Sequence, residues 1–193
     1  MRSLNVQLSK RIDETLAPLI AGHAQRICII DPPDHPNVGD NAIFLGELAF
    51  LRRNFPHARI DFFDVGNYTS ACDRFIQECS IILMHGGGNF GEIWPRHHAI
   101  RMEILKRFPG KPMLQFPQSI SFATQAGIDS TARAIERQGN LTLLVRDRKS
   151  QAFAEKHFPC TTVLCPDMAF ALGDLARQPA SLDFLCLLRG DKE

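Results

Sequence analysis

The segment SIILMHGGGNFGEIWP, residues 80–95, contains the pattern G-x-G-x-x-G over residues 86–91. In dinucleotide-binding proteins this pattern follows the first strand, and an acidic residue ends the next strand about 20 residues later. Here it follows the third predicted strand, and the next strand ends at residues 115–117 without a carboxylate. A tight turn alone would explain the glycines. We favour a turn whose backbone N–H groups lie close to an anionic or hydroxyl-rich ligand.

Two histidines and an arginine flank this segment and could move protons or bind anions. His85 directly follows an apolar run, where a strand-end side chain reaches the ligand crevice of a parallel sheet. His97 and Arg101 are spaced i, i+4, so they share a helix face and could together hold a carboxylate or phosphate. We therefore take His85 and His97 as candidates for proton transfer. A core histidine and a solvated helix face are the structural alternatives.

Polar side chains follow five predicted strands at the point where each strand ends. Because the carboxyl ends of parallel strands meet at one edge of a sheet, these residues are expected to line one crevice. Helix capping by Asp40 or Asp167, and an internal ion pair between Arg146 and Asp147, would explain these four residues without a ligand. The candidate binding residues are Asn37, Gly39, Asp40, Gly86, Gly87, Gly88, Asn89, Trp94, Arg101, Gln118, Ser119, Arg146 and Asp167.

The elements that must position these residues alternate along the chain. Short apolar runs predict strands over residues 26–31, 59–65, 80–85, 111–117, 141–146 and 160–167. Helical periodicity predicts helices over residues 4–20, 37–53, 70–79, 98–108, 129–139 and 147–158. Strands that alternate with helices and are apolar on both faces predict an α/β fold with a doubly wound, mostly parallel, Rossmann-like sheet of about six strands.

The helix ends carry recognisable signals. Asp40 or Asn41 is expected to cap the second helix, and Asp129 or Ser130 the fifth. Gly139 is expected to end the fifth helix.

Composition narrows the class of protein. The 193 residues are 45% hydrophobic with a formal net charge of +1, which gives no electrostatic footprint for nucleic acid. No apolar run reaches about 18 residues, and the first residues lack the apolar core of a secretory signal. The six cysteines form no C-x-x-C pair and no Cys/His spacing typical of zinc, so we expect no metal site. These features indicate a cytoplasmic protein, with peripheral association at the inner membrane as an open alternative.

The chain is expected to divide near its end. Residues 1–173 form the predicted Rossmann-like domain, and the polar, proline-containing residues 174–181 are typical of a linker. Residues 182–193 begin with an apolar run that predicts the first strand of a second domain, truncated in this chain.

Five motifs in this order resemble the polysaccharide pyruvyl transferases, specifically the N-terminal domain of the enzymes that form pyruvate ketals on exopolysaccharides. They are NVGDNAIF, LMHGGGNFGEIWPRHHAIR, QFPQSISF, LLVRDRKS and CPDMAFAL, and the resemblance covers residues 33–193. It departs from the family pattern at Ser121, where many relatives have histidine, and at Glu92, where aspartate is usual.

The resemblance implies the N-terminal half of a GT-B fold. It also implies transfer of pyruvate from phosphoenolpyruvate to two hydroxyls of a sugar, forming a ketal. The acceptor would be an exopolysaccharide or cell-wall glycan unit, often a lipid-linked oligosaccharide. Phosphoenolpyruvate is a substrate, so no cofactor is implied. The candidate residues above fall in the five motifs and would bind these substrates.

Relatives bind phosphoenolpyruvate partly through basic residues of the second domain, so activity of this chain alone is an open question. Two other functions stay open on the residues: a GT-B sugar-nucleotide glycosyltransferase, and a non-catalytic glycan-binding remnant. The oligomeric state is not predicted.

Overall fold

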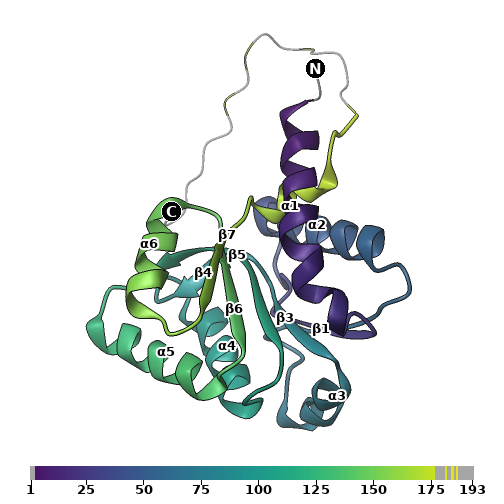
Figure 1. Ribbon diagram of the computed structural model, residues 1–193. Helices are drawn as coiled ribbons and strands as arrows, with labels where there is room; N and C mark the ends of the chain where they lie inside the picture. Colours follow the sequence, from purple (N-terminus) through teal and green to yellow (C-terminus); the bar gives the residue numbers. More distant parts are fainter. Residues whose placement is uncertain (1–2, 177–180, 182–183, 185, 187–193) are drawn as a thin grey trace.

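The computed structural model describes residues 3–176, 181, 184 and 186 and shows an α/β domain (Figure 1). The helices are α1 (Leu4–Ile20), α2 (Val38–Asn54), α3 (Asp73–Glu78), α4 (Pro95–Arg107), α5 (Gln125–Gln138) and α6 (Arg148–His157), with 3-10 turns η1 (Ala21–His23), η2 (Ser70–Cys72) and η3 (Met168–Leu172). The strands are β1 (Arg26–Ile30), β2 (Arg59–Phe63), β3 (Ile81–Met84), β4 (Gly87–Gly91), β5 (Met113–Ser121), β6 (Leu141–Val145) and β7 (Thr161–Leu164).

The strands form one parallel sheet in the order β2-β1-β3-β5-β6-β7, with β4 also paired to β5. The prediction of a doubly wound, Rossmann-like sheet is confirmed. From β1 the chain proceeds to β2 on one side, and it later reaches β3 on the other side of β1. The switch point between β1 and β3 is where ligands bind in sheets of this kind.

β4 is the strand that the sequence did not predict. The first part of β5 pairs with β3, and its last residues pair with β4, so β4 continues the line of β3 after a break at His85 and Gly86. The glycine segment predicted as a turn is therefore largely a strand. Gly91 shows why glycine is needed, since a Cβ there would lie 1.8 Å from the carbonyl oxygen of Ser121.

Alternate residues of the strands face two separate apolar cores. Ile27, Ile29 and Leu83 pack with α1, α2 and η3, whereas Cys28 and Met84 pack with α3, α4, α5 and α6. Figure 1 shows α1 and α2 together at the upper right and α4 and α5 at the lower left. This double cover explains why the strands read as continuous apolar runs.

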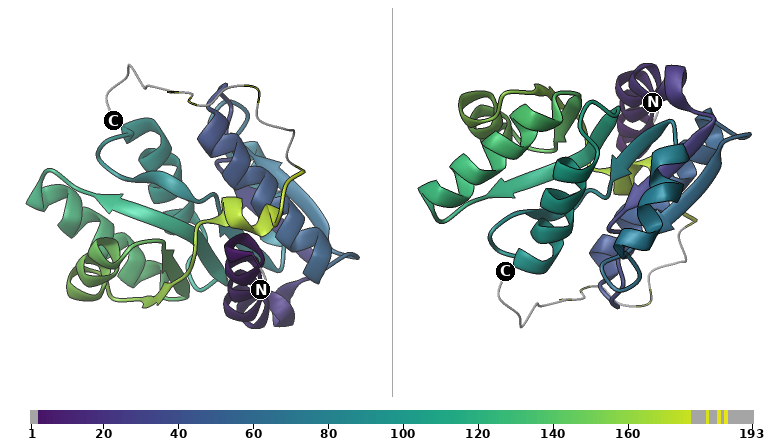
Figure 2. Two further views of the ribbon diagram at one scale, coloured as in Figure 1. Left: turned by 90° about the horizontal axis from the view of Figure 1, so that it is seen from above. Right: turned by 90° about the horizontal axis from the view of Figure 1, so that it is seen from below.

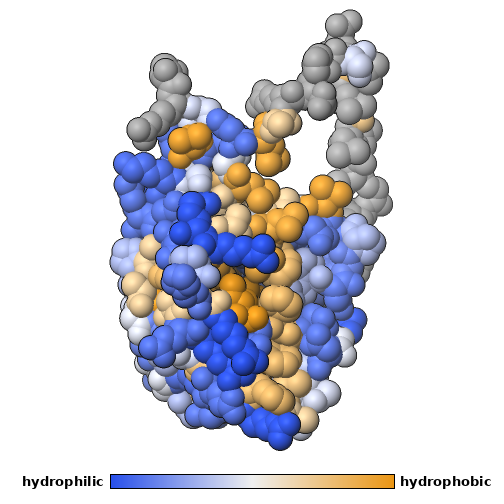
Figure 3. Space-filling view, turned by 90° about the vertical axis from the view of Figure 1, so that its right-hand side faces the viewer, coloured by the Kyte–Doolittle hydropathy of each residue, from blue (hydrophilic) through white to orange (hydrophobic). Residues whose placement is uncertain are grey.

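η3 lies between α1 and α2 (Figure 2, left). It packs so closely on α2 that a Cβ on Gly46 would lie 1.9 Å from the carbonyl oxygen of Met168. The side of the molecule shown in Figure 3 has an apolar stripe between polar surfaces. No helix among the described residues is both long and apolar enough to cross a membrane.

Helix capping differs in part from the predictions. Asn37 caps α2, because its side chain accepts from the backbone N–H groups of Gly39 and Asp40, so neither Asp40 nor Asn41 is the cap. Thr124 caps α5, which begins four residues before the expected Asp129. Gly139 ends α5 with φ 74°, as predicted.

The predicted domain boundary lies at the edge of the described structure. Residues 177–180 of the predicted linker, and all of the predicted strand over residues 182–193 except residues 184 and 186, lie outside the described residues.

Candidate functional site

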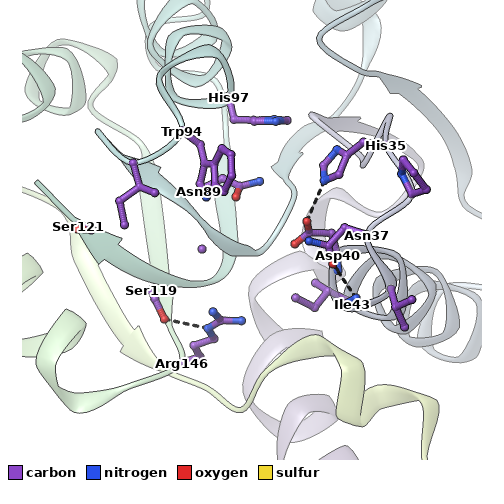
Figure 4. A pocket seen from close by; sticks show the side chains of 15 residues that line it. His35, Asn37, Asp40, Ile43, Asn89, Trp94, His97, Ser119, Ser121 and Arg146 are labelled. Atoms are coloured by element: carbon purple, nitrogen blue, oxygen red, sulfur yellow. Dashed lines mark hydrogen bonds and ion pairs between the residues drawn. The ribbon is translucent and has the colours of Figure 1, made fainter. Parts of the chain in front are cut away.

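A cavity of about 960 Å³ opens at the carboxyl ends of the central strands, beside the switch point (Figure 4). The loop after β1, β4, the start of α4, the end of β5 and the residue after β6 each form part of its wall. The lining residues are His35, Pro36, Asn37, Val38, Gly39, Asp40, Ile43, Gly88, Asn89, Ile93, Trp94, His97, Ser119, Ser121 and Arg146.

The structure brings nine of the fifteen predicted site residues to this cavity. They are Asn37, Gly39, Asp40, Gly88, Asn89, Trp94, His97, Ser119 and Arg146. The other six lie beneath or beside it, and they are His85, Gly86, Gly87, Arg101, Gln118 and Asp167. The strand-end argument therefore predicted residues that the fold brings to one cavity, but it did not separate the residues of the wall from those beneath it.

His85 belongs to the support. It is buried, and its Nδ1 lies 3.0 Å from both carboxylate oxygens of Glu47, which is itself fully buried. Its carbonyl oxygen accepts hydrogen bonds from Arg101, Gln115 and Gln118. Direct proton transfer by His85 stays a prediction. In the structure His85 connects several buried side chains beneath the cavity.

His97 and Arg101 share a helix face, as their spacing predicted, and both contact one carboxylate. The carboxylate belongs to the chain itself: Asp31 accepts from His97 Nδ1 at 2.8 Å and pairs with the Arg101 guanidinium. Burial alone would raise the pKa of Asp31, but the Arg101 charge and the His97 hydrogen bond lower it below its usual value. Arg101 is therefore occupied within the protein, whereas the imidazole of His97 reaches the cavity wall.

Asp31 was not predicted, although it ends the first strand. Its φ of 64° is the one positive value at a described non-glycine residue. A positive φ is unfavourable for aspartate and persists only where neighbouring groups stabilise it. Here His97 and Arg101 of α4 hold the Asp31 carboxylate. The turn directs a buried carboxylate towards His97 and away from the strand axis.

His35 is a second residue that the sequence reasoning missed. It lies in the proline-rich loop after β1, with Nε2 3.0 Å from Asp40 and Nδ1 3.2 Å from Asp34. Burial alone would lower the pKa of His35, but the hydrogen bonds to Asp40 and Asp34 raise it above its usual value. Its ring centre lies 5.7 Å from that of His97. The rule that located Asn37 would also have located His35.

Arg146 is the arginine of the cavity wall. It pairs with Asp167 at 2.6 Å and donates from Nε to Ser119 Oγ at 2.9 Å, so the expected pair with Asp147 is replaced by one with Asp167. Asp147 instead caps α6 through the Ser150 N–H. Burial alone would raise the pKa of Asp147, but its hydrogen bonds with Ser150 and Ser119 lower it.

The glycines mainly serve close packing. A Cβ on Gly86 would lie 2.9 Å from the carbonyl oxygen of Pro117, and Gly87 has φ 111°. The Gly86 N–H donates to Glu47 and the Asn89 N–H to Gln118, so these two donors are satisfied within the protein. Gly88 alone of the three consecutive glycines lines the cavity, near Arg146.

The cavity wall thus combines two imidazoles, one guanidinium and several side chains that are able to hydrogen-bond to hydroxyl groups. Asp40, Asn37 and Asn89 offer carboxylate and amide groups, and Ser119 and Ser121 offer hydroxyls. This set can bind a ligand that carries both negative charge and hydroxyl groups, and it places proton-transfer groups beside that ligand.

The chain is similar to known proteins over most of its length. Residues 37–192 match the family described as Polysaccharide pyruvyl transferase. Pyruvyl transferase 1 of Schizosaccharomyces pombe is 31% identical over 88% of this chain and 45% of its own length. Putative pyruvyl transferase EpsO of Bacillus subtilis is 30% identical over 100% of this chain and 58% of its own length.

The chain thus spans about half the length of these curated relatives. The matched segment contains every residue of the cavity wall except His35 and Pro36. The chain belongs to the polysaccharide pyruvyl transferase family.

Proposed function

We propose that this cavity takes part in transfer of pyruvate from phosphoenolpyruvate to a sugar of an exopolysaccharide or cell-wall glycan unit, forming a pyruvate ketal. The observation that supports it is the wall itself, where His97 and Arg146 face one cavity together with hydroxyl-binding side chains. Family membership supports the pyruvyl transfer. The donor, the ketal and the acceptor class are parts of the proposal. So is a location at the cytoplasmic face of the inner membrane, where a lipid-linked acceptor would be reached.

The reaction needs two bonds to form at one carbon. The methylene carbon of phosphoenolpyruvate gains a proton, and one sugar hydroxyl loses its proton as its oxygen bonds to the neighbouring carbon. The bond from that carbon to the phosphate oxygen then breaks, and the second hydroxyl adds as phosphate leaves. Two hydroxyl protons are released, of which one replaces the proton delivered to the methylene carbon and one goes with phosphate. The protein must therefore shuttle a proton and hold two anionic groups.

His97 is suited to the proton transfer. Asp31 holds its Nδ1 at 2.8 Å, which fixes the ring and its tautomer and directs Nε2 away from the protein interior. His97 would thus deliver the proton to the methylene carbon or take one from a sugar hydroxyl.

Arg146 is suited to binding an anionic group of phosphoenolpyruvate. Its Nε and Nη1 are bonded to Ser119 and Asp167, which fix the guanidinium at the wall beside Gly88. A side chain on Gly88 would stand 3.7 Å from Nη2, so glycine keeps the approach to that edge open. Asp40, Asn37 and Asn89 would then bind sugar hydroxyls on the opposite side.

The test is phosphate release from phosphoenolpyruvate with a lipid-linked oligosaccharide acceptor, with the ketal identified by mass spectrometry. Because the chain spans about half of its relatives' length, the assay uses the 193-residue chain and the same chain extended by a relative's C-terminal half. Ketal formation by either supports the proposal. If the extended chain folds but releases no phosphate, the proposal is contradicted. Transfer of a sugar from a sugar nucleotide would instead indicate a glycosyltransferase.

Two variants connect the activity to this cavity. His97→Gln should lower the rate by about 10²- to 10⁴-fold, the usual contribution of a positioned acid or base. Arg146→Gln should weaken use of phosphoenolpyruvate, whereas Arg59→Gln, at an exposed arginine of edge strand β2, should leave it unchanged. Equal activity of His97→Gln and the unmodified chain would remove His97 from the mechanism.

A further inference from the structure

Three side chains of types that can bind metal ions, from two distant segments, come together beside the cavity. Asp34 and His35 lie in the loop after β1, and His97 lies in the first turn of α4. One ligand atom of each, a carboxylate oxygen and two imidazole nitrogens, lies within 4.8 Å of the other two. The sequence spacing gave no sign of this group, because the fold alone joins its members.

In each imidazole, one ring nitrogen is hydrogen-bonded to a carboxylate. His97 bonds through Nδ1 to Asp31, so Nε2 is left as the donor atom for a ligand. His35 bonds through Nε2 to Asp40, and its Nδ1 is hydrogen-bonded to Asp34 Oδ1 at 3.2 Å, a contact that an ion bound by both groups would replace. A carboxylate on the far nitrogen is the usual support of a metal-binding histidine, since it fixes the tautomer and raises the basicity of the ligand nitrogen.

The support is itself rigid. Asp31 is fully buried and is held by Arg101, which in turn bonds to Gln115 and to the carbonyl oxygen of His85. His35 and Asp34 are by contrast partly exposed, with side-chain exposures of 36% and 28%. One ligand is thus fixed and two can adjust. Figure 4 shows the His97 ring directed towards the loop that carries His35.

We propose that Asp34, His35 and His97 form a binding site for a divalent transition-metal ion, with Zn²⁺ as the representative. Two nitrogens and one oxygen suit Zn²⁺ and its first-row neighbours, whereas Mg²⁺ and Ca²⁺ prefer oxygen ligands alone. Ligands at about 2.0–2.2 Å from the ion stand closer together than 4.8 Å, so a small rotation of His35 and Asp34 completes the site. Three protein ligands leave a coordination position open, and here it would face the cavity.

The metal site does not depend on which donor substrate binds in the cavity, but it competes with the role proposed above for His97. A nitrogen that binds a metal carries no proton, so while the ion is bound His97 Nε2 cannot transfer one. Metal binding is therefore measured directly, and its failure would leave the test of pyruvyl transfer untouched.

The experiment titrates Co²⁺, and then Zn²⁺ in competition, into the chelator-treated 193-residue chain. We expect one ion per chain and visible Co²⁺ bands without the near-ultraviolet band of a cobalt–thiolate bond. Asp34→Ala should weaken binding at least tenfold and is placed outside the buried network, so it tests the site without endangering the fold. His97→Ala should weaken it further.

His57→Ala removes an exposed histidine of another loop and should bind as the unmodified chain does. A thiolate band would place the ion on one of the cysteines and overturn the proposal. Binding that is absent from the unmodified chain, or unchanged in Asp34→Ala and in folded His97→Ala, would also overturn it.

Discussion

At the scale of single residues, the chain uses charged groups beneath the cavity to position those on its wall. His97 and Arg101 were predicted to hold an anion because helical spacing places them on one face. That the anion is Asp31 could not be predicted, because its carboxylate reaches α4 only through a positive φ. His35 could have been found, since it follows the first strand as Asn37 does.

The buried pair between Asp31 and Arg101 gives a first prediction. Arg101→Met leaves the buried carboxylate without its guanidinium and should lower the free energy of unfolding by about 3–5 kcal/mol. Urea unfolding followed by circular dichroism measures it. Arg107→Met breaks a partly exposed pair with Glu103 and Asp73 and should lower the free energy of unfolding far less. Similar losses in the two variants would contradict the importance of burial here.

His98 gives a prediction about pH. Burial, together with a smaller effect of the nearby Arg101 charge, lowers the pKa of His98 to about 4. Between pH 6.5 and 4 the unfolded chain therefore binds a proton that the folded chain does not, so the free energy of unfolding falls as the pH falls. The expected loss is on the order of 3 kcal/mol. Nδ1 of His98 has no hydrogen-bond partner among the described residues, so a proton there would lack an acceptor.

The measurement is urea unfolding at several pH values for the unmodified chain and for His98→Phe. Phenylalanine keeps the edge contacts with Phe90 and Phe122 and cannot take up a proton. The variant should lose less stability towards pH 4, whereas His57→Ala should follow the unmodified chain. Parallel curves for the unmodified chain and His98→Phe would show that His98 contributes nothing to acid sensitivity.

At the scale of elements, apolar runs predicted six of the seven strands and the order of strands and helices. β4 was missed because glycine has low strand propensity and its pairing with β5 depends on tertiary structure. The presence of each helix was predictable from its apolar residues, but the residue at which the helix begins was less so. α5 begins before its apolar stripe, so the capping residue is Thr124 and not Asp129.

Gly91 tests whether β4 must approach β5 so closely. Gly91→Ala puts a methyl group 1.8 Å from the Ser121 oxygen at a φ of 128°, and strain and overlap together should lower the free energy of unfolding by at least about 3 kcal/mol. Gly110→Ala has the same kind of strain, with φ 74°, but no atom within 4 Å, and should lower it by about 1–2 kcal/mol.

Hydrogen exchange at the Glu92 amide, which donates to the Ser121 carbonyl, locates the effect. Exchange at that amide should become faster in Gly91→Ala and stay unchanged in Gly110→Ala. If the two variants were equally stable, the contact of β4 with β5 would be looser than the structure indicates.

At the scale of the whole molecule, α1 is part of the core although it precedes the segment that matches the family. Its residues Ile12, Leu16 and Ile20 are fully buried against α2 and the sheet. The apolar stripe on residues 4–20 predicted a helix, and the core that the stripe enters depends on η3 and β1 being in place.

Leu16→Ala should therefore lower the free energy of unfolding by about 2–5 kcal/mol through loss of buried contacts and a new cavity. Leu4 lies on the same helix but is 67% exposed, so Leu4→Ala should change it by less than about 0.5 kcal/mol. Removing residues 1–24 should abolish the cooperative thermal transition. A chain without them that still unfolded cooperatively would show that α1 is an accessory helix.

The wall of the cavity runs from His35 to Arg146, and that span has a consequence for synthesis. A nascent chain that has emerged only as far as α4 contains both imidazoles and their carboxylates, yet it lacks β5, β6 and the arginine that face them. Strands β1, β2 and β3 can already pair at that stage, but β4 pairs with β5, so the segment that carries Gly88 and Asn89 has no neighbouring strand until β5 has emerged. The complete cavity wall can therefore form only after Arg146 has left the ribosome.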